Sequence, residues 1–549
     1  MANDGSGATT FTSPSLPTSA ETAYVWQLAR SGSLPADPAN LRRMLSVAPA
    51  EVERYDEEIR TFRGLGDQHA SRLLSERDTL VSYTAFCRSV LSPAQKLPNE
   101  LLAKIFDLYF HETLHPGTGA ITLEDQMQFF TRRALQELAQ VCFRWYCVAI
   151  GTPQLWSTII IHSDVWDRSF VYPEILTKLL ASLLIRGKDY PLIIEMSIYP
   201  TMHCKRVLAL LCRHARRWRK AHFWSIPQSQ TFFHPTKNLK LDRLVSLSLD
   251  VESESWKDIT AFQNSPFLTE LTVARFHKLP ILPWPQIKTV TYNSLGDGNP
   301  VRSALSVLRT AINMSICTLL LDLRRYDPNS ESWGIHTTSR TQELYIQLMT
   351  SAGNDNDPVL GRFLDSLTLP RLTVLDIHPD DGGGVGVGVF PPLWSAAAFL
   401  DLADRSGFNN STSLTSLALY VQVTDVELLH CLSAVPQLEK LELRDCVPAA
   451  VTDTFLRGLQ LHGSTPLVPH LGLFSICCGL DFDDSTWVDL LASRRRVHSG
   501  QNRPFKAKLW WYEPRTRAVS SEALERIAQL VSEGGLVFDS GAYVSGIHG

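Results

Sequence analysis

LEKLEL, Leu438 to Leu443, contains the pattern that decides the fold of this chain. Its last three residues alternate between apolar and polar, which is typical of a strand that buries one face. Its first leucine comes three positions earlier, where the chain turns into the strand. The same spacing of aliphatic or aromatic residues, L-x-x-L-x-L, occurs seven times. The seven copies begin at Leu244, Leu268, Ile287, Leu372, Leu414, Leu438 and Leu471.

The spacing of these copies indicates a repeat array. Leu244 and Leu268 are 24 residues apart, as are Leu414 and Leu438, whereas the other intervals between neighbouring copies are 19, 33, 42 and 85 residues. A 24-residue period resembles that of leucine-rich repeats. One such unit cannot bury its apolar face alone, so we expect the copies to stack into a curved parallel sheet backed by helices. Because the Asn or Cys that usually closes the turn is mostly absent, we expect an irregular solenoid over residues 161–549.

Two further segments support a mixed α/β fold around this array. After residue 156, strand-like stretches near 157–163, 191–198 and 220–226 alternate with apolar helical patterns. Near the C-terminus, SEALERIAQLVSEGG predicts an amphipathic helix with Ser520 or Ser521 as its N-cap. We expect this helix to close the array as a C-terminal cap.

A different pattern occupies KLPNELLAKIFDLYF, Lys96 to Phe110. Pro98 stands just inside the start of a predicted short helix, where its missing N–H costs nothing. Leu101, Ile105 and Leu108 recur at helical spacing, and further apolar residues lie beside them. A second apolar stretch, residues 135–159, predicts more short helices. Two or three short helices cannot bury this much apolar surface among themselves. We therefore expect part of the surface to face a partner or the rest of the chain.

In order and residue type, these two stretches resemble the F-box-like domain, in the version found in fungi. The resemblance spans residues 93–160 and contains an insertion at 111–131 between the first and second helices. In that family the helices dock on the Skp adaptor of SCF (Skp–cullin–F-box) ubiquitin ligases. The resemblance implies an adaptor surface formed or supported by Leu97, Pro98, Leu101, Ile105, Phe106, Leu138, Val141, Cys142 and Trp145.

The order of parts, an F-box-like domain followed by repeats, implies a function. The chain would be a non-enzymatic substrate-recognition subunit of an SCF-type ligase, without catalytic residues or cofactors, whose repeats bind target proteins of unknown identity. The alternative is an interaction scaffold of the same architecture outside any ligase. The insertion at 111–131 favours that alternative if it blocks docking of the adaptor.

The region before the F-box-like domain has two parts. Residues 1–40 begin with a segment rich in Ser, Thr, Pro and Gly, and we expect them to be poorly ordered. Over residues 41–92 apolar residues recur with a seven-residue period, interrupted by Gly64 and Gly66. This pattern predicts a helical hairpin or a coiled-coil-like segment.

Composition excludes several classes of protein. A formal net charge of −4 gives no electrostatic footprint for nucleic acid. No apolar run is long enough for a membrane span, and the N-terminus lacks the pattern of a secretory signal. The ten cysteines show no paired metal spacing, so we expect reduced thiols and an intracellular protein of the cytoplasm or nucleus.

Four local motifs have a plainer explanation than a reactive site. HETLH, His111 to His115, matches the zinc-protease signature, but Pro116 ends the helix that the chemistry needs, and no third ligand follows at a recognised spacing. The Gly-rich run at 382–388 lacks the phosphate-loop lysine and precedes prolines. We expect the basic cluster at 213–220 to be surface, and the aromatic residues at 218–224 and 510–512 to belong to the core and edge of the solenoid. No metal site is expected.

Overall fold

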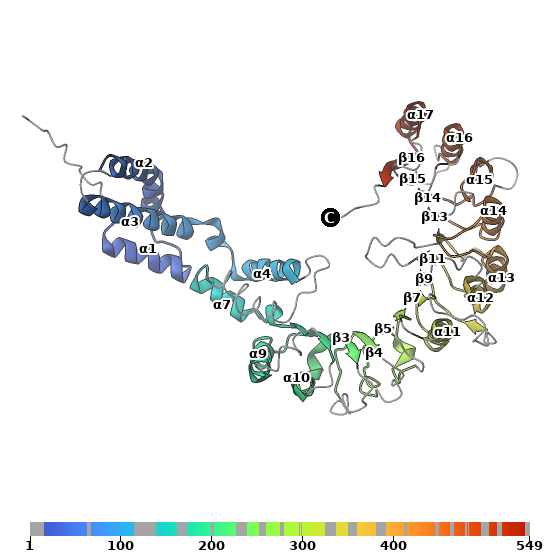
Figure 1. Ribbon diagram of the computed structural model, residues 1–549, viewed down its shortest axis with the longest axis horizontal. Coiled ribbons are helices and arrows are strands. Elements are labelled where there is room, and N and C mark those ends of the chain that lie inside the picture. The colour runs from blue at the N-terminus through green and yellow to red at the C-terminus, as the bar shows by residue number, and fades with distance from the viewer. Residues whose placement is uncertain are drawn as a thin grey trace, which may run out of the picture. The chain divides into compact units, whose positions relative to one another are not determined.

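The computed structural model describes residues 16–62, 67–114, 138, 140–161, 173–198, 202–226, 239–251, 260–274, 279–295, 297, 299–323, 336–349, 359–379, 391–410, 414–444, 450–461, 466–477, 480, 482–495, 504–512 and 519–543. The chain divides into two compact units, residues 1–192 and 193–549. The first is mainly helical, and the second contains most of a large, mainly parallel sheet (Figure 1). The expectation of a mixed α/β fold is confirmed.

The first unit begins with helix α1 (Ser19–Ser31). Thr18 accepts a hydrogen bond from the backbone N–H of Glu21, whose carboxylate accepts one from Thr18 in return, which forms a capping box. Val25 and Ala29 of α1 are buried against the late part of α3. Over residues 19–31 the structure therefore differs from the poorly ordered segment expected for residues 1–40, because the cap and this buried face stabilise a helix. Residues 1–15 of that segment lie outside the described part of the chain.

Helices α2 (Pro38–Phe62) and α3 (Asp67–Leu91) follow. Leu41, early in α2, clusters with Cys87, late in α3. Ile59, late in α2, clusters with Leu73, early in α3. The two helices therefore run antiparallel, an arrangement of the hairpin type. An ion pair of 2.8 Å between Arg77 Nε and Asp56 Oδ1 also joins them.

The rest of the first unit is built from short elements. They are η1 (Pro93–Lys96), α4 (Asn99–Leu114), α7 (Phe143–Gly151), η3 (Pro153–Trp156), β1 (Thr158–Ile161) and α9 (Pro173–Arg186). Helix α4 continues past residue 111, where the insertion was expected to begin, and residues 115–137 lie outside the described part of the chain. The Arg186 guanidinium lies over the Trp156 ring, so α9 packs with the elements before it. The first unit ends at residue 192, so β1 and α9 belong to it.

The second unit contains strands in chain order with helices between them. Its strands in the large sheet are β2 (Leu192–Ser197), β3 (Trp218–Ile226), β4 (Ser246–Val251), β5 (Glu270–Ala274), β6 (Thr289–Asn293), β7 (Ile316–Asp322), β9 (Glu343–Met349), β11 (Val374–Pro379), β12 (Ser416–Leu419), β13 (Lys440–Arg444), β14 (Leu473–Cys477), β15 (Phe505–Tyr512) and β16 (Leu536–Tyr543). A small separate sheet pairs β8 (Thr337–Thr338) with β10 (Leu367–Thr368).

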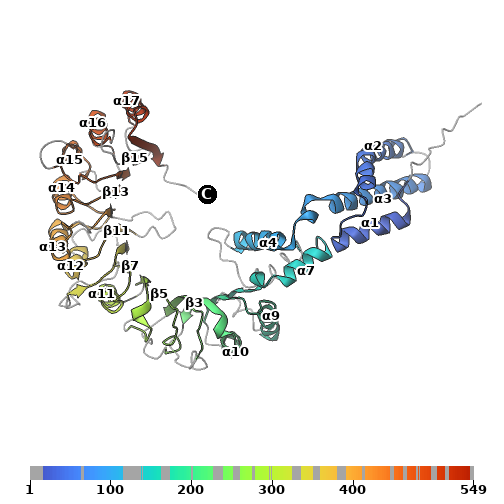
Figure 2. The same ribbon diagram turned by 180° about the vertical axis from the view of Figure 1, so that it is seen from behind.

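The helices of the second unit lie on one side of the large sheet. They are α10 (Met202–Cys212), α11 (Pro300–Thr310), α12 (Val359–Asp365), α13 (Ala396–Ser406), α14 (Asp425–Ser433), α15 (Asp453–Gly458), α16 (Asp484–Arg494) and α17 (Ser521–Ser532), with short turns η4 (Ala215–Arg217) and η7 (Trp284–Gln286). Figures 1 and 2 show α11 to α17 on the outer side of the strands, so none of these described helices covers the other face of the sheet, here called the open face.

From β3 to β16 every neighbouring pair of strands is parallel, and the register aligns the repeated pattern. Its second positions form one continuous row, and its third positions form another, next to the first. Every side chain in both rows from β4 to β15 is at most 2% exposed. The second-position row is Leu247, Leu271, Val290, Cys317, Leu344, Leu375, Leu417, Leu441, Phe474 and Ala507.

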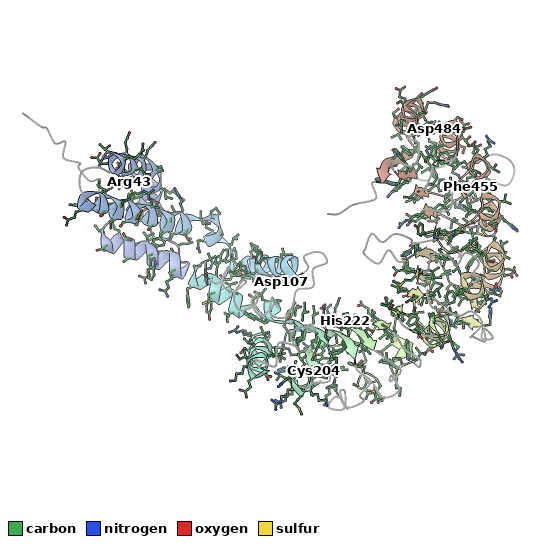
Figure 3. The ribbon with its side chains drawn as sticks, in the orientation of Figure 1. Arg43, Asp107, Cys204, His222, Phe455 and Asp484 are labelled. Carbon is green, nitrogen blue, oxygen red and sulfur yellow. The ribbon has the colours of Figure 1, made fainter. Side chains whose placement is uncertain are left out.

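In the C-terminal half, hydrogen bonds to aspartate side chains join the N-terminus of one helix to that of the next. Asp425 of α14 accepts a hydrogen bond of 2.7 Å from the hydroxyl of Thr452, the N-cap of α15. Asp453 of α15 accepts one of 2.9 Å from the backbone of Asp483, the N-cap of α16. Asp484, labelled at the start of α16 in Figure 3, accepts one of 2.8 Å from the backbone of Ser520. Each helix start is thus fixed to the next.

Candidate functional site

Helix α4 has one buried face and one exposed apolar face. Leu102 and Phe106 are at most 1% exposed and belong to the core of this region. Leu101, Ile105 and Leu108 remain 50%, 46% and 56% exposed. Because they recur at i, i+4 and i+7, they lie in one row along the helix. Such a row of large apolar side chains is what a partner-binding surface presents before the partner binds.

Helix α7 packs against the buried face of α4. The rings of Trp145 and Phe106 lie 5.1 Å apart, and Val148 and Ala149 fill the same core. The Trp156 indole N–H donates to the carbonyl of Ala149 at 3.0 Å, which closes the region on its C-terminal side.

The nine residues implied by the F-box-like resemblance fall into three groups. Those that expose their side chains are Pro98, Leu101, Ile105 and Val141. Those that are partly buried are Leu97, Leu138 and Trp145, all packed against the core under α4. Those that are buried are Phe106 and Cys142. The first group is available for contact, whereas the last group can act only by holding the surface in place.

Arg144, which the sequence analysis did not single out, fixes the geometry between α7 and the start of α4. Its Nη1 donates to the carbonyl of Gln95 at 2.6 Å, and its Nε donates to the side chain of Asn99 at 3.0 Å. Its Nη2 donates to the carbonyl of Leu97. One guanidinium thus binds two carbonyls in the turn that precedes α4 and the side chain of the first residue of α4, which only an arginine fork can do.

Substitution Arg144→Ala should lower the stability of the first unit by about 2 kcal/mol, because two backbone carbonyls lose their donors. Urea unfolding followed by circular dichroism measures this loss. Arg88, an exposed arginine late in α3, supplies the control as Arg88→Ala. An Arg144→Ala variant as stable as the Arg88→Ala variant contradicts the assigned role.

A second surface feature adjoins α7. Trp26 and Arg30 of α1, Phe86 of α3, and Val141 and Tyr146 line a groove of about 570 Å³. The Arg30 guanidinium lies 5.0 Å from the centre of the Trp26 ring. Val141 belongs both to this groove and to the exposed group described above. No local sequence pattern indicates this groove, because its walls come from segments that are far apart along the chain.

The other motifs have structural roles where the structure describes them. Trp218 and Phe223 are fully buried, as expected for core residues, and Arg217 in the basic cluster is also buried. The HETLH side chains and the Gly-rich run at 382–388 lie outside the described residues. None of the eight described cysteines forms a disulfide, and burial raises the pKa of the Cys431 thiol to about 11. That thiol therefore stays protonated at neutral pH.

Within the described ranges, no group of three His, Cys, Asp or Glu side chains could hold a metal ion. Over the same ranges, none of the helices has both the length and the apolar character needed to cross a bilayer. Neither a protein-family model nor a curated protein sequence matches the chain.

Proposed function

We propose that this protein is the substrate-recognition subunit of an SCF-type ubiquitin ligase. In this proposal, the exposed row on α4 binds the Skp adaptor and the second unit recruits target proteins. The observation that carries the proposal is the split of α4 into a buried face and an exposed apolar row. Because Leu101 and Ile105 stay about half exposed, their burial in a partner would supply binding energy that the folded chain leaves unused.

We further propose that the second unit is an irregular leucine-rich-repeat solenoid. Two continuous rows of buried side chains along parallel strands, with helices on one side only, support this reading of the pattern. Each strand buries its apolar residues against its neighbours, as stacked repeats do. The open face of the sheet would then be the surface that meets target proteins.

The test is binding of purified Skp adaptor to the full chain and to a Leu101→Ala, Ile105→Ala double variant. Both side chains are exposed, so their truncation leaves no cavity in the core. We expect affinity to fall about 30-fold, because interface anchors contribute at least about 1 kcal/mol each. Titration calorimetry measures the affinity, and circular dichroism checks the fold.

A matched control comes from α9 in the same unit. Ile175 and Ile185 are 47% and 75% exposed on a helix surface. Because leucine and isoleucine have the same number of carbon atoms, Ile175→Ala with Ile185→Ala truncates as many apolar atoms elsewhere. This control should bind the adaptor like the unmodified chain. If the unmodified chain does not bind the adaptor, the ligase assignment fails, and an interaction scaffold of the same architecture replaces it.

A further inference from the structure

Between β4 and β15, the charged side chains on the open face of the sheet are segregated by sign. The flanking strands end this pattern, with Lys220 on β3 and with Asp539 on β16 opposite Lys508. The seven strands of the large sheet from β4 to β12 contain five carboxylates and neither lysine nor arginine. Strands β13 to β15 contain four cationic residues and one carboxylate. The five carboxylates are Asp250, Glu270, Asp322, Glu343 and Asp376, and the four cations are Lys440, Arg444, Lys506 and Lys508.

The carboxylates at the centre of the acidic part share the open face. Glu343 precedes the buried Leu344, and Asp376 follows the buried Leu375, so both point away from the helices. The register places Asp376 opposite Tyr345, whose hydroxyl donates to Glu343 at 2.9 Å. Tyr345 therefore lies beside two carboxylates on adjacent strands, of which it binds Glu343, while Asp376 lies 3.0 Å from His378 Nδ1 of its own strand.

The basic part lies on the same face. Lys506 and Lys508 of β15 are exposed and alternate with buried residues. On β13, Lys440 and Arg444 each lie 3.3 Å from Glu442, so that strand keeps one net positive charge. Strand β14, between them, carries no charge.

The distance between the two parts suits a short peptide segment. Strands β11 and β15 are four steps apart in the sheet, which is about 19 Å at 4.8 Å per step. An extended chain covers that distance with about six residues. A segment of about a dozen residues, laid across the strands, therefore reaches both parts.

We infer that the open face binds an extended segment of a partner protein in which basic and acidic residues are segregated into two halves. Its Lys and Arg residues lie over β5 to β11, and its Asp and Glu residues lie over β13 to β15. A nucleic acid does not fit, because its uniform negative charge is repelled by the longer, acidic part. This inference rests on the proposed function, whose class of target protein it specifies.

The probes are two fluorescent peptides of identical composition, each about a dozen residues of lysine and glutamate. In one, the lysines and glutamates occupy separate halves, and in the other they alternate. Fluorescence anisotropy with the full chain at low ionic strength should show about tenfold tighter binding of the segregated peptide. Equal affinity for both peptides, or no binding of either, overturns the inference.

Charge-reversal variants locate the binding site. Glu343→Lys with Asp376→Lys should remove the preference for the segregated peptide. Adding Lys506→Glu and Lys508→Glu should restore it, because the peptide can bind in the opposite direction. Asp401→Lys with Asp404→Lys, at two exposed sites on α13 on the helical side, makes the same change of charge away from the face and should leave the preference intact.

These measurements separate the inference from the proposed function. Adaptor binding together with equal peptide affinities retains the ligase and rejects the charge-segregated target. Discrimination between the peptides without adaptor binding retains the open face as a docking surface and rejects the ligase. If the quadruple variant stays folded by circular dichroism but does not regain the preference, the assigned site is wrong.

Discussion

Arg494→Ala should destabilise the C-terminal part of the second unit by about 3–5 kcal/mol, because buried carbonyls lose their donors at once. Arg494 ends α16 and is 1% exposed. Its Nε donates to the carbonyl of Leu459 at 2.6 Å, and its two terminal nitrogens donate to those of Val468 and Leu467 at 3.1 and 2.9 Å. One side chain thus joins α16 to the preceding turn.

Backbone strain at one of these acceptors increases the expected effect. Val468 has a φ of 41°, a left-handed conformation that a β-branched residue rarely adopts. The surrounding structure must hold such a residue in place. Without the Arg494 fork, the turn at Val468 is free to relax, and the start of β14 moves with it.

Thermal unfolding and hydrogen exchange at β14 measure the effect of Arg494→Ala. Arg495 provides a neighbouring control, since its guanidinium pairs at the surface with Glu533, and Arg495→Ala should cost far less. Arg494→Lys should be intermediate, because an ammonium cannot reach all three carbonyls. If Arg494→Ala unfolds at the same temperature as Arg495→Ala, the structural role assigned to the Arg494 guanidinium is wrong.

Phe106→Ala should destabilise the first unit by about 3–5 kcal/mol, the usual cost of emptying a buried aromatic site. Phe106 is fully buried on α4, and its ring lies 5.1 Å from that of Trp145. Leu101, on the same helix, is 50% exposed, so Leu101→Ala should change stability by no more than about 0.5 kcal/mol.

Urea unfolding of the two variants measures this contrast, and Phe106→Leu supplies a variant that keeps most of the volume. The proposed adaptor surface adds a second measurement. Leu101→Ala should weaken adaptor binding without loss of stability. Phe106→Ala should weaken adaptor binding only in proportion to the fraction of protein in which this region is unfolded. Equal stabilities of Phe106→Ala and Leu101→Ala would show that the assigned core is wrong.

Sequence predicted those elements whose pattern is local and periodic. All seven copies of L-x-x-L-x-L lead into a strand, and their second positions fall into one buried row. The strands β7 and β9 belong to the same rows, but Met314 and Thr341 occupy their first positions. Thr341 is buried there because its hydroxyl has a partner, Ser339, at 2.9 Å. A single sequence does not reveal such compensation.

The sequence pattern does not predict the helix at Ser19–Ser31, because that helix also depends on contacts with residues far away along the chain. Its own composition is weakly amphipathic, and its stability depends on packing Val25 and Ala29 against distant residues such as Tyr83 of α3. Burial raises the pKa of Tyr83 to about 12, with further contributions from Cys87 and Glu21. The capping box Thr18-x-x-Glu21 is visible in the sequence and was the one local sign of a helix start.

The sequence by itself determined the strands of the repeat, their buried positions and the helical character of Lys96 to Phe110, because these depend on periodicity within one element. Only the tertiary structure decided which apolar residues of α4 stay exposed, which carbonyls Arg144 and Arg494 bind, and how charges on separate strands form one face. These features join residues that are far apart along the chain. Tertiary packing brings these residues together, and a pattern within one short segment contains no information about that packing.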